Sequence, residues 1–172
     1  NGSTPLHLAC SAAGDEFLIR HLLKWKANMY TIDSRGHTPF HLCILNQRVD
    51  LMRAFLLDDD VDEDHVKIKP YDVNKALCDE GFMTPDPVLI TAVNQNDLNI
   101  VKFLIDSCGA DLDTVSPRNH FSPIQHACRN NNYKMVELLM NKGASLNLES
   151  LDGSLPCSIS DRRILNLFKG RG

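Results

Sequence analysis

Thr4-Pro5-Leu6-His7-Leu8-Ala9-Cys10 is the stretch that decides the fold, because close copies of it occur further along the chain. The stretch Thr38-Pro39-Phe40-His41-Leu42-Cys43 repeats it 34 positions later, and a weaker copy is Ser122-Pro123-Ile124-Gln125-His126-Ala127-Cys128. Self-similarity at such a period is typical of stacked-repeat architectures. The sequence therefore predicts a series of similar units.

Each copy of this motif has the residues that begin a helix. A Thr or Ser hydroxyl at the N-cap accepts a hydrogen bond from a free N–H of the first turn. Proline suits the next position, because it has no N–H to leave unpaired and its φ is already helical. A small residue follows four places later, which lets a neighbouring helix come close (Ala9, Cys43 and Ala127).

The motif T-P-L-H-x-A at a period near 33 resembles the ankyrin repeat, which is two antiparallel helices followed by a hairpin. The resemblance implies an all-α protein, an ankyrin-repeat α-solenoid of stacked helix-turn-helix units with short β-hairpin fingers. We expect a single domain over residues 1–172. Its predicted repeats are residues 1–35, 36–81, 82–119 and 120–152, with a C-terminal cap at 153–172.

Apolar spacing predicts the helices inside these repeats. The expected pairs are residues 5–12 and 15–25, 39–46 and 49–57, 87–95 and 98–107, and 123–130 and 133–141, followed by a shortened pair from 156 to 168. The third repeat is degenerate at its start, where Pro87-Val88-Leu89-Ile90-Thr91-Ala92 replaces the motif.

An insertion at about residues 58–71 interrupts the second repeat, and its first part, 58–64, is strongly acidic. An EF-hand calcium loop requires Gly at position 6 and Glu at position 12, but counting from Asp58 these positions hold Glu63 and Lys69. We expect a protruding, mobile loop that does not hold calcium. A contact with a basic partner is the alternative function.

Charge and composition argue against several classes of protein. The net charge of −4 and the 6% aromatic content are unfavourable for nucleic-acid binding. No apolar run approaches the roughly 18 residues that span a bilayer, so no membrane insertion is expected. Six cysteines without C-x-x-C spacing indicate reduced thiols in the cytoplasm or nucleus. The chain is interpreted as a piece of a longer protein.

The sequence contains no arrangement that indicates catalysis. It lacks a G-x-S-x-G elbow, a phosphate-binding glycine loop and the H-E-x-x-H spacing. The protein is therefore predicted not to be an enzyme, and no cofactor or metal is expected. His7 and His41 are interpreted as structural residues. The family resemblance implies that each ring bridges its own helix start to the neighbouring hairpin.

The resemblance also implies a function, because hairpin tips and first helices in this family line a concave surface that grips proteins. We expect a non-catalytic protein–protein interaction module, a scaffold that binds a protein segment. The alternative is a regulatory or docking domain of a larger multidomain enzyme or channel. The predicted partner-binding residues are Tyr30, Asp33, Arg35, His37, Arg118, His120, Phe121 and Arg129. Of these, Tyr30, Arg35 and Arg118 rank first, because Tyr and Arg are enriched in interface hot spots.

Overall fold

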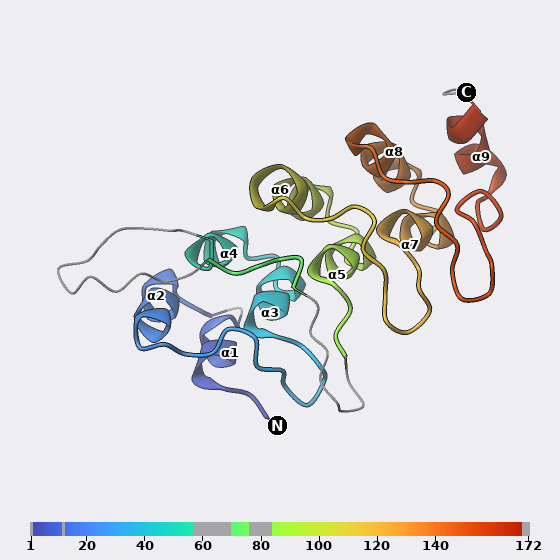
Figure 1. Ribbon diagram of the computed structural model, residues 1–172. Coiled ribbons are helices and arrows are strands. Elements are labelled where there is room, and N and C mark those ends of the chain that lie inside the picture. The colour runs from blue at the N-terminus through green and yellow to red at the C-terminus, as the bar shows by residue number, and fades with distance from the viewer. Residues whose placement is uncertain (1, 12, 57–69, 76–83, 170–172) are drawn as a thin grey trace. The chain divides into compact units, whose positions relative to one another are not determined.

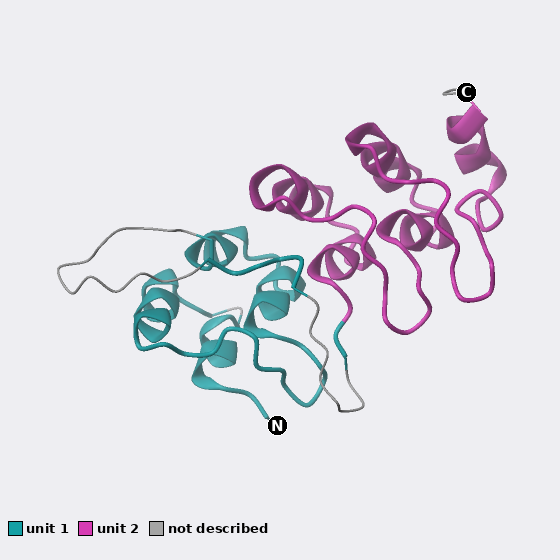
Figure 2. Ribbon diagram, in the orientation of Figure 1, with its two compact units in different colours: residues 1–85 teal, residues 86–172 magenta. Residues whose placement is uncertain are grey.

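The computed structural model describes residues 2–11, 13–56, 70–75 and 84–169. These residues form two compact units, residues 1–85 and residues 86–172 (Figure 2), and each is described by itself. Most of the inserted segment, from residue 58 to 69, lies outside the described residues. The expectations of a protruding loop without calcium therefore remain predictions, as does the single domain over residues 1–172.

The first unit contains two helix pairs (Figure 1). Helices α1 (Pro5–Ala9) and α2 (Glu16–Lys24) form the first pair, and α3 (Pro39–Leu45) and α4 (Val49–Ala54) form the second. Helix α1 packs against α2 and α3, and α2 also packs against α4. The two pairs therefore stack, first helix on first helix and second helix on second helix.

The first helix of each pair begins as the repeated motif predicts. Thr4 and Thr38 are N-caps, and in each case the residue three places later, His7 or His41, completes a capping box. Proline occupies the first helical position in both. Two orphan N–H groups are satisfied at each helix start, which lets helices of only five and seven residues form.

The second unit continues the pattern with α5 (Val88–Asn94), α6 (Leu98–Cys108), α7 (Pro123–Arg129), α8 (Tyr133–Lys142) and α9 (Arg162–Lys169). Helix α5 packs on α6 and α7, and α7 packs on α8. The degenerate start of the third repeat has a physical consequence, because α5 begins after Pro87 without any side-chain cap.

The observed helices confirm the predicted all-α stack, with small differences at the ends. Helix α1 ends at Ala9, earlier than the expected residue 12, and residues 156–159 form a turn before α9. Among the described residues there is no strand, so the hairpin fingers are closed turns. The finger of the first repeat is held by backbone bonds from the N–H of Asp33 to the carbonyl of His37 and from the N–H of Gly36 to the carbonyl of Asp33 (both 2.9 Å).

The core of each unit lies between its helices. In the first unit Phe40 stacks on Tyr71 at 4.4 Å between ring centroids and meets Phe55 edge-on at 5.5 Å. In the second unit Ile124, Val136 and Leu139 are fully buried. Burial of these side chains is the main source of stability in such a stack, because a single repeat cannot cover its own apolar face.

Candidate functional site

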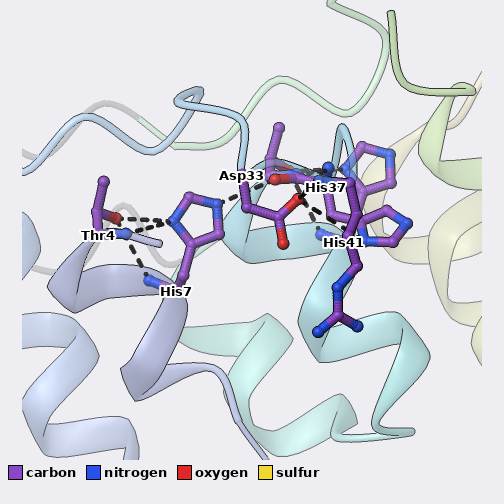
Figure 3. A network of polar contacts seen from close by, with 7 residues as sticks. Thr4, His7, Asp33, His37 and His41 are labelled. Carbon is purple, nitrogen blue, oxygen red and sulfur yellow. Dashed lines mark hydrogen bonds and ion pairs between the residues drawn. The ribbon is translucent and has the colours of Figure 1, made fainter. Parts of the chain in front are cut away.

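His7 connects the start of α1 to the finger of the first repeat (Figure 3). Its Nδ1 accepts a hydrogen bond from the backbone N–H of Thr4 (3.1 Å) and lies 2.8 Å from the Thr4 hydroxyl. Because Nδ1 is an acceptor, Nε2 carries the proton and donates to the carbonyl of His37 (3.0 Å). The structural role predicted for His7 is confirmed, since the buried ring joins two segments of backbone.

Asp33 organises the turn of the same finger. The residue is only 8% exposed, and its Oδ1 accepts hydrogen bonds from the N–H groups of Arg35 and His37 (both 2.9 Å). Desolvation by itself would raise the pKa of this carboxyl, but the two backbone N–H donors and the nearby His37 outweigh it and lower the pKa. Asp33 is thus an ionised turn residue that faces into the finger.

His37 and His41 lie next to this turn, with their ring centroids 6.4 Å apart. The half-buried His37 has its Nδ1 4.0 Å from Asp33 Oδ1, beyond hydrogen-bonding distance. His41 Nδ1 accepts from the N–H of Thr38 (3.3 Å) and lies 2.7 Å from its hydroxyl, so this ring caps α3 as His7 caps α1.

Gln125 does in the second unit what His7 does in the first. Its Oε1 accepts from the N–H of Ser122 (2.8 Å), and its Nε2 donates to the carbonyls of Leu148 (3.1 Å) and Ser154 (2.7 Å). The amide oxygen replaces the acceptor nitrogen of histidine, and the amide nitrogen replaces its N–H. Gln125 therefore links its helix to a finger as His7 does, although the residue type differs.

Tyr30 is used within the first unit. Its hydroxyl accepts a hydrogen bond from the N–H of Asp72 (2.9 Å), and its ring stacks on Tyr71 at 4.9 Å. The ammonium of Lys75 lies 3.8 Å from the centre of the same ring. One face of this half-buried side chain is therefore covered by Lys75, while Arg35, at the finger tip, is exposed.

The finger at residues 116–121 carries two of the predicted residues on its surface. Its ends are joined by the N–H of Ser116 and the carbonyl of Phe121 (3.0 Å), and the Ser116 hydroxyl donates to Asp86 (2.6 Å). Arg118 and His120 are exposed. His120 has a φ of 56°, the left-handed conformation that Gly36 adopts at the equivalent place in the first finger.

Phe121, His126 and Arg129 form a cluster between this finger and α7. The ring of Phe121 is 7% exposed and meets His126 edge-on at 5.7 Å, and the guanidinium of the exposed Arg129 lies 5.7 Å from its centre. Burial lowers the pKa of His126, against the opposing effect of Asp86. Arg129 is therefore exposed at the surface, with its guanidinium next to the buried ring of Phe121.

The eight predicted residues divide by exposure. Four are exposed, Arg35, Arg118, His120 and Arg129, and two are half-buried, Tyr30 and His37. Asp33 and Phe121 are buried and support the fingers from inside. Register along the repeats located the fingers, but it missed Gln125 and Tyr71, which hold them in place. The role of Gln125 could have been predicted, because it occupies the place of His7 in the repeated motif.

The exposed residues among those predicted are three arginines and a histidine. Across the described ranges, no group of three or more His, Cys, Asp or Glu side chains could hold a metal ion. Every helix formed by the described residues is too short or too polar to span a membrane.

Comparison with known proteins gives the family. The ankyrin-repeat pattern (three copies) matches residues 1–69 and 64–150. The B-cell lymphoma 3 protein homolog of Mus musculus is 30% identical over 167 residues, 96% of this chain and 34% of the mouse protein. Ankyrin repeat protein nuc-2 of Neurospora crassa is 27% identical over 83% of this chain and 12% of its own length.

A third relative, Rabankyrin-5 of Mus musculus, is 27% identical over 86% of this chain and 14% of its own length. The chain thus spans about a third of the first relative and about an eighth of the other two. The matched pattern covers most of the chain, and the capped helix pairs and hydrogen-bonded fingers agree with it. The chain belongs to the ankyrin-repeat family.

Proposed function

We propose that this chain is a non-catalytic module that binds a protein segment through its fingers and first helices, the face predicted to be concave. Ankyrin repeats are in general protein-interaction modules. The observation that carries the proposal is the exposure of Arg35, Arg118 and Arg129 on backbone that buried polar contacts hold in place.

Rigid support increases the value of these arginines as anchors. Asp33 fixes the turn that presents Arg35, and the Ser116–Asp86 contact fixes the finger that presents Arg118. A side chain on ordered backbone loses less freedom on binding than one on a loose loop, so more of its contact energy appears as affinity. Arginine is also among the residues most enriched at interface hot spots.

His120 adds an independent argument for the second finger. A left-handed φ is unfavourable for histidine, and glycine takes this position at Gly2, Gly36 and Gly153. Strained residues of this kind concentrate at binding sites, where the side chain itself is needed. We infer that the exposed His120 imidazole is a contact residue beside Arg118.

Photo-crosslinking tests the surface directly. A photoreactive amino acid replaces Arg118 in one variant, Arg35 in another, and the exposed Glu137 of α8 in a matched control. We expect cross-links to a protein partner in cell extract from positions 118 and 35 and not from 137. Equal cross-linking from all three positions, or cross-linking from position 137 alone, would contradict the proposal.

The length of the relatives supports the second candidate, a regulatory or docking role inside a larger protein, since 66% or more of each lies outside the region matched here. The same cross-links distinguish the two functions when the full-length protein is used. Products that join position 118 to another part of the same chain indicate docking, and products with a separate protein indicate a scaffold.

Location in the cytoplasm or nucleus is part of this proposal. Three of the described cysteines, Cys10, Cys43 and Cys128, are buried. Burial raises the pKa of Cys128 to about 11, and a hydrogen bond with Cys10, together with burial, raises that of Cys43. Such thiols act as small apolar core residues, which suits a reducing compartment.

A further inference from the structure

The finger at residues 116–121 and helix α7 carry a group of basic side chains in an acidic chain. The chain has 22 acidic residues and a net charge of −4, yet no Asp or Glu lies between Asp113 and Glu137. The basic cluster in this interval consists of three exposed residues and one half-buried residue, namely Arg118, His120, Arg129 and His126. A surface that is locally basic in this way attracts acidic partners and repels basic ones.

The two arginines of the basic cluster have charges that the chain itself does not neutralise. Neither Arg118 nor Arg129 forms an ion pair with another described residue. The carboxylate of Asp86 accepts from the Ser116 hydroxyl (2.6 Å), and that of Asp152 accepts from two serines of its own finger. An incoming carboxylate can therefore bind either arginine without breaking an ion pair of the protein.

Arg129 and His126 lie close together on α7. They are three residues apart and so share one side of the helix, and both contact the ring of Phe121, each at 5.7 Å from its centre. A guanidinium against an aromatic ring keeps its in-plane N–H donors available for a carboxylate. The Nε2 of His126 is buried and has no hydrogen-bond partner among the described residues, so an anion at Arg129 acts on this ring through its charge.

His126 takes up a proton less readily than an ordinary histidine. Burial is the main effect that lowers its pKa, Arg129 lowers it further, and Asp86, just before α5, acts in the opposite direction. Helix α5 packs on α7 and has no charged side chain, and the charged residues of α8, which also packs on α7, are the exposed Lys134, Glu137 and Lys142. The fingers on either side bring Arg118, His120 and Asp152. A carboxylate bound at Arg129 offsets the positive charge beside the ring, which favours the imidazolium form.

We propose that the basic cluster binds an acidic protein segment, with an Asp or Glu carboxylate of that segment on Arg129, and that binding adds a proton to His126. The inference rests on the proposed function, because it names the chemistry of the partner at the same surface. Binding and protonation favour each other. Affinity should therefore rise as the pH falls toward and below about 6.5, where the carboxylates of the segment are still ionised.

A random-peptide phage library tests the charge of the partner. The full chain carries a photoreactive amino acid at Asn130, which is exposed beside Arg129, and the peptides that cross-link to it are sequenced. We expect them to be enriched in Asp and Glu. Their binding should weaken about tenfold or more in Arg129→Glu, because charged partners of a contact are costly to reverse. Arg163→Glu is the matched control, since it makes the same change of charge at an exposed residue of α9 and should leave binding unchanged.

The outcomes separate this inference from the proposed function. Peptides that cross-link at position 130 without an excess of acidic residues, or that bind Arg129→Glu and Arg163→Glu equally well, overturn the acidic partner and leave a peptide-binding surface in place. If no peptide cross-links at position 130, the result contradicts the surface itself and therefore both proposals.

The proton is tested with a selected acidic peptide. Its affinity for the unaltered chain should rise severalfold between pH 7.5 and 6.0, and His126→Gln should abolish the rise. Heats of binding in two buffers of different ionisation enthalpy count the protons taken up by the unaltered chain, so this part does not depend on the folding of a variant. No proton uptake at pH 6.5, or a pH dependence that His120→Gln abolishes and His126→Gln keeps, overturns the role of His126.

Discussion

At the scale of single residues, the fingers depend on buried polar side chains that bond to backbone. Asp33 and His7 both hold the finger of the first repeat, one from inside the turn and one from α1. Buried donors left without a partner cost more than an ordinary hydrogen bond contributes. Substitutions at these positions should therefore change the stability of the finger directly, and change the binding surface only as a consequence.

Asp33→Ala should destabilise the first unit by about 1–3 kcal/mol, because it orphans the N–H groups of Arg35 and His37. Asp33→Asn keeps an acceptor oxygen and should cost less. Chemical denaturation at pH 7 measures both. The lowered pKa of Asp33 means that its ionised form stabilises the fold above the unfolded-state pKa, and that this contribution is lost as the pH falls through the folded-state value. Asp33→Asn should remove this part of the acid sensitivity.

His126 should make the second unit sensitive to milder acid. Burial lowers its pKa, its Nε2 has no hydrogen-bond partner in the described structure, and the groups that act on it are Asp86 and Arg129. The unfolded state therefore takes up a proton more readily, and stability should fall as the pH drops below about 6.5. His126→Leu should flatten the stability curve between pH 7.5 and 5, and an unchanged slope in this variant would contradict the assignment.

At the scale of elements, helix ends distinguish the repeats from one another. Helices α6 and α8 are followed by Gly109 and Gly143, both in the left-handed conformation, whereas Lys26 adopts a φ of 59° just after α2. A residue with a Cβ is strained there, and glycine is not. The end of α2 is therefore less favourable than the ends of its counterparts.

Lys26→Gly should stabilise the first unit by about 0.5–1 kcal/mol, because it removes this strain at the end of α2. Thermal or urea unfolding measures the gain. The control is Lys102→Gly, an exposed lysine inside α6, which should lose about 1 kcal/mol through helix propensity. A loss of stability in both variants would show that the side chain of Lys26, and not its backbone, is what matters.

At the scale of the whole molecule, the stack derives its stability from apolar side chains at equivalent positions. Leu139 is fully buried in α8, on the side from which Lys142 pairs with Asp106 of α6 in the preceding repeat, and Leu51 and Met135 are also fully buried. In repeat proteins stability is close to a sum of repeat terms and neighbour interfaces. Truncation of one interface residue should therefore lower the free energy of unfolding considerably.

Leu139→Ala should cost about 2–5 kcal/mol in equilibrium unfolding, through lost transfer energy and the cavity left behind. Leu151→Ala is the matched control, since this leucine is 68% exposed at a turn and its change should stay within about 0.5 kcal/mol. Similar losses in both variants would mean that burial at the stacking side does not dominate.

The sequence by itself determined the repeated units. A capping Thr or Ser, a proline and a small residue act within one turn of helix. The starts of α1, α3 and α7 could therefore be predicted locally, from Thr4, Thr38 and Ser122. Apolar spacing set the second helices in the same local way. The fingers were located because they follow at fixed distances. The bridge from His7 to a finger, which the family resemblance implied, is also confirmed.

Tertiary structure alone decided which of those finger residues reach solvent. Exposure depends on what the neighbouring segments cover, so Tyr71 and Lys75, more than forty positions along the chain, determined that Tyr30 is partly covered. Register could not show that Asp33 and Phe121 point inward while Arg35 and Arg118 point outward. Leu18 of α2 and Leu51 of α4 occupy equivalent positions in sequence, three residues after the N-cap. Leu18 is nevertheless 45% exposed and Leu51 is fully buried, because different segments pack against them.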